Sequence, residues 1–503
     1  MISPPHSKWP RWASTSLLAL LAVVCFLPAA PASAASGPRP NIFFIMGDDH
    51  PWPDYGFMSK LQDRDAPWDV SNPSANTYYA ETTRGDGTKP PQLHPDHPRI
   101  DAVSAVNCAE VSAGGANRLS TEFKACEAAD TGTPNFDWLA QRGAVFPLAY
   151  VSHARCIESF ASTLTGFYTT QLDDPANGGA DRIGNYLQPT GYISFGYGKI
   201  WDRGYELIGF DVGSIVRNEA EIRTKAPKDV DDRRARREYR KVTNSGDRSK
   251  SRPRKGIGAL QRFFDIYYDP AVYPDANTRP PWFIWYSPRL PHAPLNTGKD
   301  FVMETRDQFG KQSRGKGPRL FGNMRVLDIR LGEIFDELES EGDLENTIII
   351  YQNDNGYILP DSKRGKGENG YRTPFMISGP GIPPNQILPH LAIAVDLLPT
   401  IMDYACEGAP SCPSSPDWKG STLRPIMETS TPVTGREYVF APKIRPLKTF
   451  VRSIDGYRLM RNETGVYFLY DMYNDPNEEV NLVTTEPAIF ARLKDQLDNN
   501  SPF

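Results

Sequence analysis

The sequence lacks a surplus of charge of either sign. Its 503 residues include 56 lysines and arginines against 61 aspartates and glutamates. It also lacks zinc-finger spacing and basic repeat modules, which together with clustered positive charge mark many nucleic-acid-binding proteins. We therefore expect no nucleic-acid partner. The length is ample for one large domain and a smaller one.

Long apolar runs are missing too, apart from one short run near the N-terminus. Residues 17–27 are apolar, follow the positive charges of Lys8 and Arg11, and precede small residues at 32–34. This run is short for a membrane span of about 20 residues, and the order of features is typical of a secretory signal peptide. We expect residues 1–35 to be a signal peptide, with an uncleaved anchor as the alternative. The mature protein is then secreted or periplasmic, or in a lysosomal-type compartment if the source is eukaryotic, without stable membrane insertion.

Cysteine is scarce, with six residues in the chain. One of them, Cys25, lies in the expected signal peptide, which leaves Cys108, Cys126, Cys156, Cys406 and Cys412. Export implies an oxidising compartment, and closeness in sequence favours disulfides between Cys108 and Cys126 and between Cys406 and Cys412. Cys156 is then unpaired. The count alone leaves open whether it has special chemistry or is a buried, inert thiol.

Several short apolar runs lead into polar residues. The runs are 42–46, 192–195, 282–286 and 347–351, and they lead into Asp48-Asp49, Lys199, His292 and Asp354-Asn355 respectively. Apolar runs of this length suit strands buried on both faces of a parallel sheet, whose carboxyl ends form the ligand crevice. Helical patterns lie between them, as in residues 327–338. We expect an α/β fold with a mostly parallel central sheet flanked by helices.

The remaining segments suggest two insertions and a smaller domain. Residues 56–132 are rich in turn-forming residues, and residues 225–255 are strongly basic. We interpret the basic run as a solvated loop, and a binding site for an acidic polymer is the alternative. Short strand-like runs follow Pro425, so we expect a catalytic domain over 36–425 and a small antiparallel C-terminal domain over 426–503.

Two pairs of oxygen-bearing residues indicate a metal site. The adjacent carboxylates of Asp48 and Asp49 repel each other unless a cation neutralises them. Asp354 and Asn355 add a carboxylate and an amide oxygen at a corresponding strand end. Either pair alone is explained by a turn or a helix cap. Together, these hard oxygen ligands favour calcium or magnesium over zinc.

The motifs around these residues occur in a recognisable order. They are R-P-N-I at 39–42 leading to Asp48-Asp49, Cys156-Ile157-Glu158-Ser159 through Gly166, Gly191-Tyr192 and Gly198-Lys199, Pro291-His292-Ala293-Pro294, Asp354-Asn355-Gly356, Glu368 through Pro374, and Tyr470-Asp471 through Leu482. In this order they resemble the sulfatase family, whose cysteine signature is C-x-P-S-R-x-x-L-L-T-G. The resemblance covers nearly the whole mature chain.

This resemblance implies an alkaline-phosphatase-like fold and a sulfuric ester hydrolase. It implies that a formylglycine-generating enzyme converts Cys156 to formylglycine, whose hydrated aldehyde binds the metal and attacks the ester sulfur. Position by position, the metal ligands are Asp48, Asp49, the converted Cys156, Asp354 and Asn355. Calcium is the expected metal, with magnesium as the alternative. Lys199 and Lys363 hold the sulfate oxygens, and His292 contacts the bridging oxygen or protonates the leaving alcohol. The substrate is a sulfated glycan, sugar or related alcohol.

Three residues depart from the family pattern. Glu158 stands in place of the signature proline, Phe160 in place of its arginine, and Asp202 in place of a histidine after Lys199. The pattern that marks the cysteine for conversion is therefore altered, and Arg155 is a candidate to replace the missing arginine. Two alternatives stay open: a phosphoester hydrolase on the same scaffold, and a non-catalytic relative that binds acidic glycans.

Overall fold

The computed structural model describes most of the chain after residue 38. The described residues are 39–50, 118–129, 133–172, 181–199, 210–211, 257–288, 290–292, 316–356, 367–409, 411–415, 417–429, 435–442, 449–475 and 478–502. The expected signal peptide, Cys108, Asp202, Lys363 and the basic insertion lie outside these ranges. Within them, no helix combines the length and the apolar character that crossing a bilayer requires.

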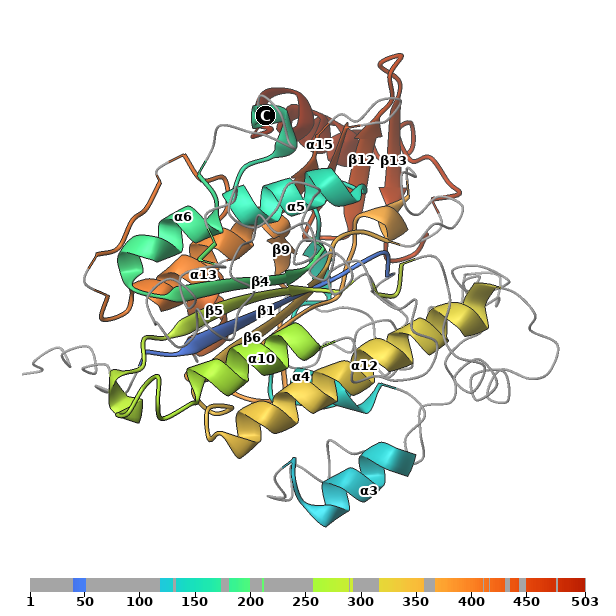
Figure 1. Ribbon diagram of the computed structural model, residues 1–503. Helices are drawn as coiled ribbons and strands as arrows, with labels where there is room; N and C mark the ends of the chain where they lie inside the picture. Colours follow the sequence, from blue (N-terminus) through green and yellow to red (C-terminus); the bar gives the residue numbers. More distant parts are fainter. Residues whose placement is uncertain are drawn as a thin grey trace, which may run out of the picture. The chain divides into compact units, whose positions relative to one another are not determined.

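A seven-stranded sheet forms the centre of the fold (Figure 1). Its strands, in spatial order, are β4 (Ile193–Gly198), β5 (Trp282–Ser287), β1 (Asn41–Gly47), β6 (Thr347–Asn353), β7 (Phe375–Ser378), β2 (Gly143–Val145) and β8 (Gln386–Ile387). The first four run parallel, whereas β7 is antiparallel to both of its neighbours. Every residue of β1, β5 and β6 is buried, as expected for strands covered on both faces. The expected α/β class with a mostly parallel sheet is confirmed.

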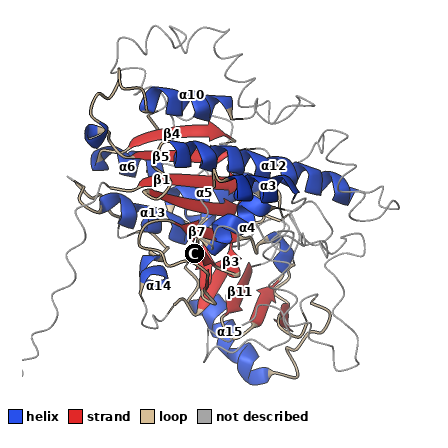
Figure 2. Cartoon of the chain, turned by 90° about the horizontal axis from the view of Figure 1, so that it is seen from below, coloured by secondary structure: helices blue, strands red, loops and turns tan. Residues whose placement is uncertain are grey.

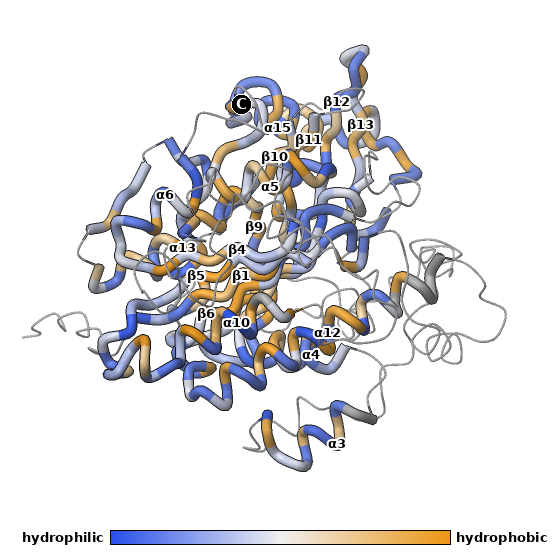
Figure 3. Tube along the Cα trace, in the orientation of Figure 1, coloured by the Kyte–Doolittle hydropathy of each residue, from blue (hydrophilic) through white to orange (hydrophobic). Residues whose placement is uncertain are grey.

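Helices cover both faces of this sheet (Figures 1 and 2). On one face lie α4 (Pro134–Gln141), α10 (Gly258–Tyr267) and α12 (Lys316–Ser340); on the other lie α5 (Cys156–Thr165), α6 (Ile183–Leu187) and α13 (Leu397–Cys406). Successive residues of β1 alternate between the two cores: Phe43 packs in the core that contains Leu331 of α12, and Phe44 in the core that contains Leu164 of α5. Figure 3 shows the hydrophobic residues gathered along β1 and β5 between these layers.

Shorter elements complete this part of the fold. Strand β3 (Leu148–Tyr150) pairs in parallel with β9 (Leu391–Ile393). In sequence, α3 (Thr121–Ala129) precedes α4, and α14 (Arg424–Glu428) follows α13. Strand β3 leads directly towards Cys156. Its pairing with β9 therefore fixes the chain just before that residue.

The C-terminal part forms the expected antiparallel sheet. Its strands are β10 (Tyr438–Ala441), β11 (Thr449–Ser453), β12 (Tyr457–Arg461) and β13 (Tyr467–Asp471), in that order. Helix α15 (Pro487–Asn499) covers one face through Leu493 and Leu497. Phe450 and Met460 belong instead to the core beneath the central sheet. The two sheets thus share apolar contacts, and the boundary near residue 425 stays a prediction.

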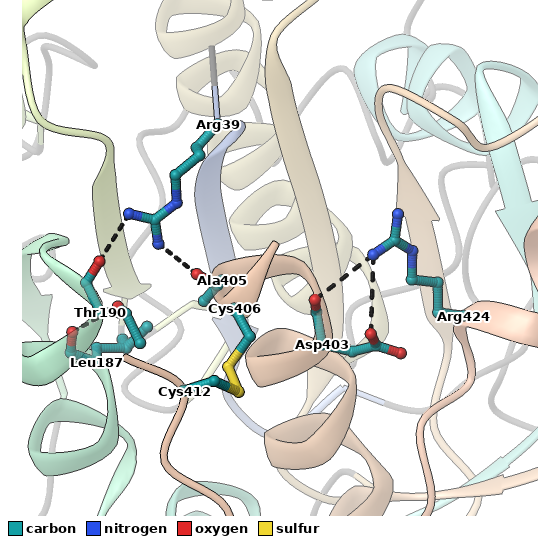
Figure 4. Close-up of a disulfide and its surroundings, with 8 residues drawn as sticks. All are labelled: Arg39, Leu187, Thr190, Asp403, Ala405, Cys406, Cys412 and Arg424. Atoms are coloured by element: carbon teal, nitrogen blue, oxygen red, sulfur yellow. Dashed lines mark hydrogen bonds and ion pairs between the residues drawn. A yellow bond between two sulfur atoms is a disulfide. The ribbon is translucent and has the colours of Figure 1, made fainter. Parts of the chain in front are cut away.

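One predicted disulfide lies near the start of β1 (Figure 4). It joins Cys406 to Cys412 at the end of α13. Beside it, the Arg39 guanidinium donates to the Thr190 carbonyl oxygen at 2.6 Å and to the carbonyl of Ala405. The Arg-Pro-Asn-Ile segment is therefore anchored to α13 before β1 begins. Cys126 is also disulfide-bonded, but its predicted partner Cys108 lies outside the described residues.

Candidate metal centre and active site

Asp48 and Asp49 follow β1 at the carboxyl edge of the sheet. Gly47 precedes them because a Cβ at that position would lie 2.4 Å from Asn353 Oδ1. Asp49 has a φ of 62°, in the left-handed region that aspartate tolerates better than most residues. Its amide donates to Asp354 Oδ1 at 2.9 Å. Both carboxylates are buried, so the tight turn after β1 holds them inside the protein.

Asp354 and Asn355 occupy the corresponding place after β6. The register pairs Gly47 with Asn353, and the Asp354 amide continues the ladder by donating to the Gly47 carbonyl at 3.1 Å. Asn355 Nδ2 donates to Asp49 Oδ1 at 2.8 Å. The parallel pairing of two neighbouring strands thus brings these distant residues together. Burial raises the pKa of Asp354 above its usual value; the Lys199 ammonium opposes the rise, and the carboxylates of Asp48 and Asp49 add to it.

Cys156 reaches the same cluster from the first turn of α5. Its sulfur lies 3.9 Å from Asp48 Oδ1 and 3.9 Å from Asp49 Oδ1. One ligand atom from each of Asp48, Asp49, Cys156 and Asp354 lies within 4.8 Å of all the others. Among the described cysteines, Cys156 is the one that is not disulfide-bonded, as expected. Burial, followed by the Asp354 carboxylate, raises the pKa of this thiol to about 12.

Lys199 enters the cluster from the end of β4. The preceding Gly198 has a φ of 100°, and a Cβ there would lie 2.1 Å from the Ser287 carbonyl oxygen. The Lys199 ammonium lies 2.6 Å from Asp48 Oδ1 and 3.3 Å from Asp354 Oδ2. Burial of the ammonium lowers its pKa, but the two carboxylates outweigh this effect and hold the pKa of Lys199 well above its usual value. Lys199 is therefore a largely buried lysine that is charged at neutral pH among the acidic residues.

His292 lies at the accessible side of the cluster. It follows β5 and Pro291, which forms an isolated parallel bridge with Asp48. His292 Nε2 lies 3.3 Å from Asp49 Oδ2, and the imidazole is about one-third exposed, with 34% of its side chain accessible. A partly exposed imidazole that is held by a buried carboxylate is well placed to exchange protons with a bound molecule.

The structure thus brings seven of the predicted site residues to one edge of the sheet. They are Asp48, Asp49, Cys156, Lys199, His292, Asp354 and Asn355. Lys363 and Asp202 lie outside the described residues. Arg155, the candidate to replace the signature arginine, instead has its guanidinium 2.9 Å from Glu158.

Sequence reasoning missed the surroundings of Lys199. The Phe160 ring centroid lies 5.1 Å from Lys199 Nζ, and Trp285 Nε1 donates to the Lys199 carbonyl oxygen at 3.4 Å. In the sequence, Phe160 marks only the absence of the signature arginine. Nothing in the local sequence signals that this ring reaches a residue that follows a different strand.

A donor set of this kind fits a hard cation. Asp48, Asp49 and Asp354 present buried carboxylates, and Asn355 Oδ1 is a buried amide oxygen that accepts no hydrogen bond within the described structure. A buried carbonyl oxygen without a partner costs free energy unless it meets a donor or a metal. The acidic cluster is therefore suited to an oxygen-seeking divalent cation.

Comparisons with known proteins agree with this arrangement. The family profile described as Sulfatase matches residues 40–407. The chain is similar to N-acetylglucosamine-6-sulfatase of Capra hircus, at 27% identity over 193 residues, or 32% of this chain and 34% of the relative. It is also similar to N-acetylglucosamine-6-O-sulfatase of Bacteroides thetaiotaomicron, at 30% identity over 173 residues, or 31% of this chain and 30% of the relative. These matches span about a third of the length of the curated relatives.

A solved structure shares the fold over most of its length. It is described as a complex with its substrate, D-glucosamine-2-N,6-O-disulfate, and matches with a TM-score of 0.55 and 17% identity over 92% of this chain and 97% of its own. Since the family profile covers well over half of the chain and includes all seven of the clustered residues, this chain belongs to the sulfatase family.

Proposed function

We propose that this protein hydrolyses sulfate esters at the acidic cluster, with the side chain derived from Cys156 as the nucleophile. The single observation that carries the proposal is the meeting of Cys156 with three buried carboxylates, whose ligand atoms lie within 4.8 Å of one another. The position of Cys156 at the first residue of α5 places it at the positive end of the helix dipole, which favours a bound anion.

Calcium is the metal that we propose for the cluster, held by Asp48, Asp49, Asp354 and Asn355. When bound, it would offset the repulsion among the carboxylates and stabilise negative charge on a coordinated oxygen. Calcium takes oxygen ligands, so a thiol at position 156 is the mismatched member of this set. Conversion of Cys156 to formylglycine is a two-electron oxidation that needs an external oxidant and releases the sulfur as sulfide. It replaces sulfur by oxygen and completes a hard donor set, and hydration of the aldehyde supplies the oxygen nucleophile. The proposed partner for the conversion is a formylglycine-generating enzyme.

The other residues of the chain then have separable roles. One hydroxyl oxygen of the hydrated aldehyde at position 156 attacks sulfur, and the bond between sulfur and the bridging oxygen breaks. The second hydroxyl then loses its proton, the bond from the carbon to the sulfated oxygen breaks, and sulfate leaves as the aldehyde re-forms. Lys199 opposes the negative charge of the sulfate group, and Lys363 is proposed to do the same from outside the described residues. His292 donates a proton to the leaving alcohol oxygen, and Asp49 Oδ2, 3.3 Å from its Nε2, orients the imidazole.

A sulfated sugar is the proposed substrate class. The relatives named above are N-acetylglucosamine-6-sulfatases, and the solved structure is described as a complex with a disulfated glucosamine. The predicted signal peptide and the disulfide between Cys406 and Cys412 are both typical of an exported protein. We therefore propose a secreted or periplasmic protein.

Two measurements on the purified protein test this proposal. Arg155 puts a trypsin cleavage site directly before Cys156, so mass spectrometry of that peptide distinguishes formylglycine from a thiol. Turnover of 4-nitrophenyl sulfate and 4-nitrophenyl phosphate, with calcium and with EDTA, then distinguishes the reaction class. We expect formylglycine and calcium-dependent sulfate release, both lost in Cys156→Ala. A thiol without turnover of either ester would favour the non-catalytic reading, and preference for the phosphate would favour the phosphoester hydrolase.

A further inference from the structure

An ion pair at the start of α5 neutralises the charge that Glu158 introduces into the signature. Glu158, which replaces the signature proline, has its Oε1 2.9 Å from Arg155 Nη1, one turn away. The pair is partly exposed, with 43% of the Arg155 side chain accessible. The negative charge of Glu158 is therefore matched by its neighbour on the same turn. The other departure, Phe160, is compensated by a different part of the fold.

Phe160 of α5 has its ring beside Lys199, the residue that follows β4. Its side chain is buried, and its ring centroid lies 5.1 Å from Lys199 Nζ and 5.8 Å from the ring of Trp285. Trp285 in turn donates from Nε1 to the Lys199 carbonyl oxygen at 3.4 Å. The backbone of Lys199 is thus held by β5, and its ammonium meets the aromatic ring of α5.

A bound metal would compete with the Lys199 ammonium for its carboxylate partners but not for the Phe160 ring. The two carboxylate partners, Asp48 and Asp354, are proposed metal ligands. A divalent cation competes for those oxygens, whereas the face of a phenyl ring is not a ligand for calcium. The attraction between an ammonium and a ring quadrupole therefore persists when the carboxylates are engaged by a cation.

We propose that Phe160 is a positioning residue that holds the Lys199 ammonium beside the reacting group, in the place where the family signature has a cation of its own. The signature arginine would add a second positive charge beside Lys199. In this chain the Phe160 ring takes its place and holds the Lys199 ammonium in position. The assignment of Lys199 to the sulfate rests on the proposed function, but the contact between Phe160 and Lys199 does not.

The contact is tested by nuclear magnetic resonance on protein labelled with [ε-¹³C]lysine, in the presence of calcium. A methylene group near the face of a ring has a ring-current shift, and Lys199→Arg assigns the signal. We expect Phe160→Met to move the Lys199 signal towards that of a lysine without a ring, and Phe160→Tyr to retain it. Phe44→Met is the matched control, because Phe44 also packs on Trp285, at 4.7 Å between ring centroids, but from β1. An unchanged signal in Phe160→Met, or equal shifts in Phe160→Met and Phe44→Met, would overturn the proposal.

Calorimetric measurement of inorganic sulfate binding tests whether the contact between Phe160 and Lys199 contributes to sulfate binding. Loss of one cation–π contact should weaken sulfate binding between about twofold and about thirtyfold in Phe160→Met, with smaller effects in Phe160→Tyr and Phe44→Met. Pentafluorophenylalanine at position 160 keeps the shape of the ring and reverses its quadrupole. It should weaken sulfate binding to the same degree, and it decides the question if Phe160→Met does not fold. Undiminished sulfate binding in the fluorinated protein would refute a positioning role.

The two proposals fail in different ways. If the wild-type protein neither binds sulfate nor turns over sulfate esters, the proposed function is wrong, while the lysine signal still reports whether Phe160 holds Lys199. If the wild-type protein is an active sulfatase and its Lys199 signal is unaffected by Phe160→Met, the proposed function stands and the role of Phe160 is wrong.

Discussion

Replacing Lys199 by methionine should make calcium binding tighter while it destabilises the calcium-free protein. The Lys199 side chain is 15% exposed, and its ammonium lies 2.6 Å from Oδ1 of Asp48, whose side chain is 1% exposed. Removing one partner of a buried ion pair costs about 3–5 kcal/mol, because the other charge stays buried without compensation. Methionine keeps the length of the side chain, so the change removes mainly charge.

Bound calcium supplies the missing positive charge, so it should recover a large part of that loss. If the loss in the free energy of unfolding is about 3 kcal/mol without calcium and about 1 kcal/mol with saturating calcium, the thermodynamic cycle requires calcium to bind about 2 kcal/mol more tightly to the variant. That difference corresponds to roughly thirtyfold in affinity.

Denaturant unfolding with calcium or EDTA, together with calcium titration calorimetry, measures all sides of this cycle. Arg461→Met is the matched control, because Arg461 pairs with Asp498 at 2.7 Å in the C-terminal sheet, where the side chain is 39% exposed. We expect that variant to lose less than about 1 kcal/mol, equally with and without calcium. Weaker calcium binding in Lys199→Met, or the same destabilisation under both conditions, would refute a cation site at these carboxylates.

Three further outcomes follow from the same structure. His292→Ala should slow hydrolysis of an alkyl sulfate by about 10²–10⁴-fold and that of 4-nitrophenyl sulfate much less, since a good leaving group needs no proton; equal losses would contradict its role as the acid. Lys363→Ala should reduce turnover at least tens of fold, on the scale of a lost transition-state contact, and wild-type activity on an aryl sulfate would exclude Lys363 from the sulfate pocket. Burial raises the pKa of Asp328 to about 7, against the lowering effect of Arg325, so its contribution to stability should be complete below about pH 4 and lost as the pH rises through about 7. Urea unfolding of the wild type and Asp328→Asn between about pH 4 and 8 should show a difference that falls by a few kcal/mol, and a constant difference would contradict the shift.

The sequence alone predicted the four parallel strands of the central sheet and the residues that follow them, but it did not predict β7, β2 or β8. Strands covered on both faces need unbroken apolar residues, so the runs that became β1, β5 and β6 were visible directly. Parallel strands end at one edge, which is why Asp48 and Asp354 were expected to meet although they are far apart in the chain. The pairing of Cys406 with Cys412 also followed from their closeness in sequence.

Only the tertiary structure decided how the charged groups are paired. Lys199 meets Asp48 because the order β4-β5-β1-β6 and the turns at Gly198 and Gly47 aim both side chains inward. The ring of Phe160 reaches Lys199 because α5 packs over the ends of these strands, and no local pattern encodes a contact between a helix and a strand end. Strand and helix periodicity records which faces are buried, whereas the partner on the other side of a buried face depends on how the layers pack.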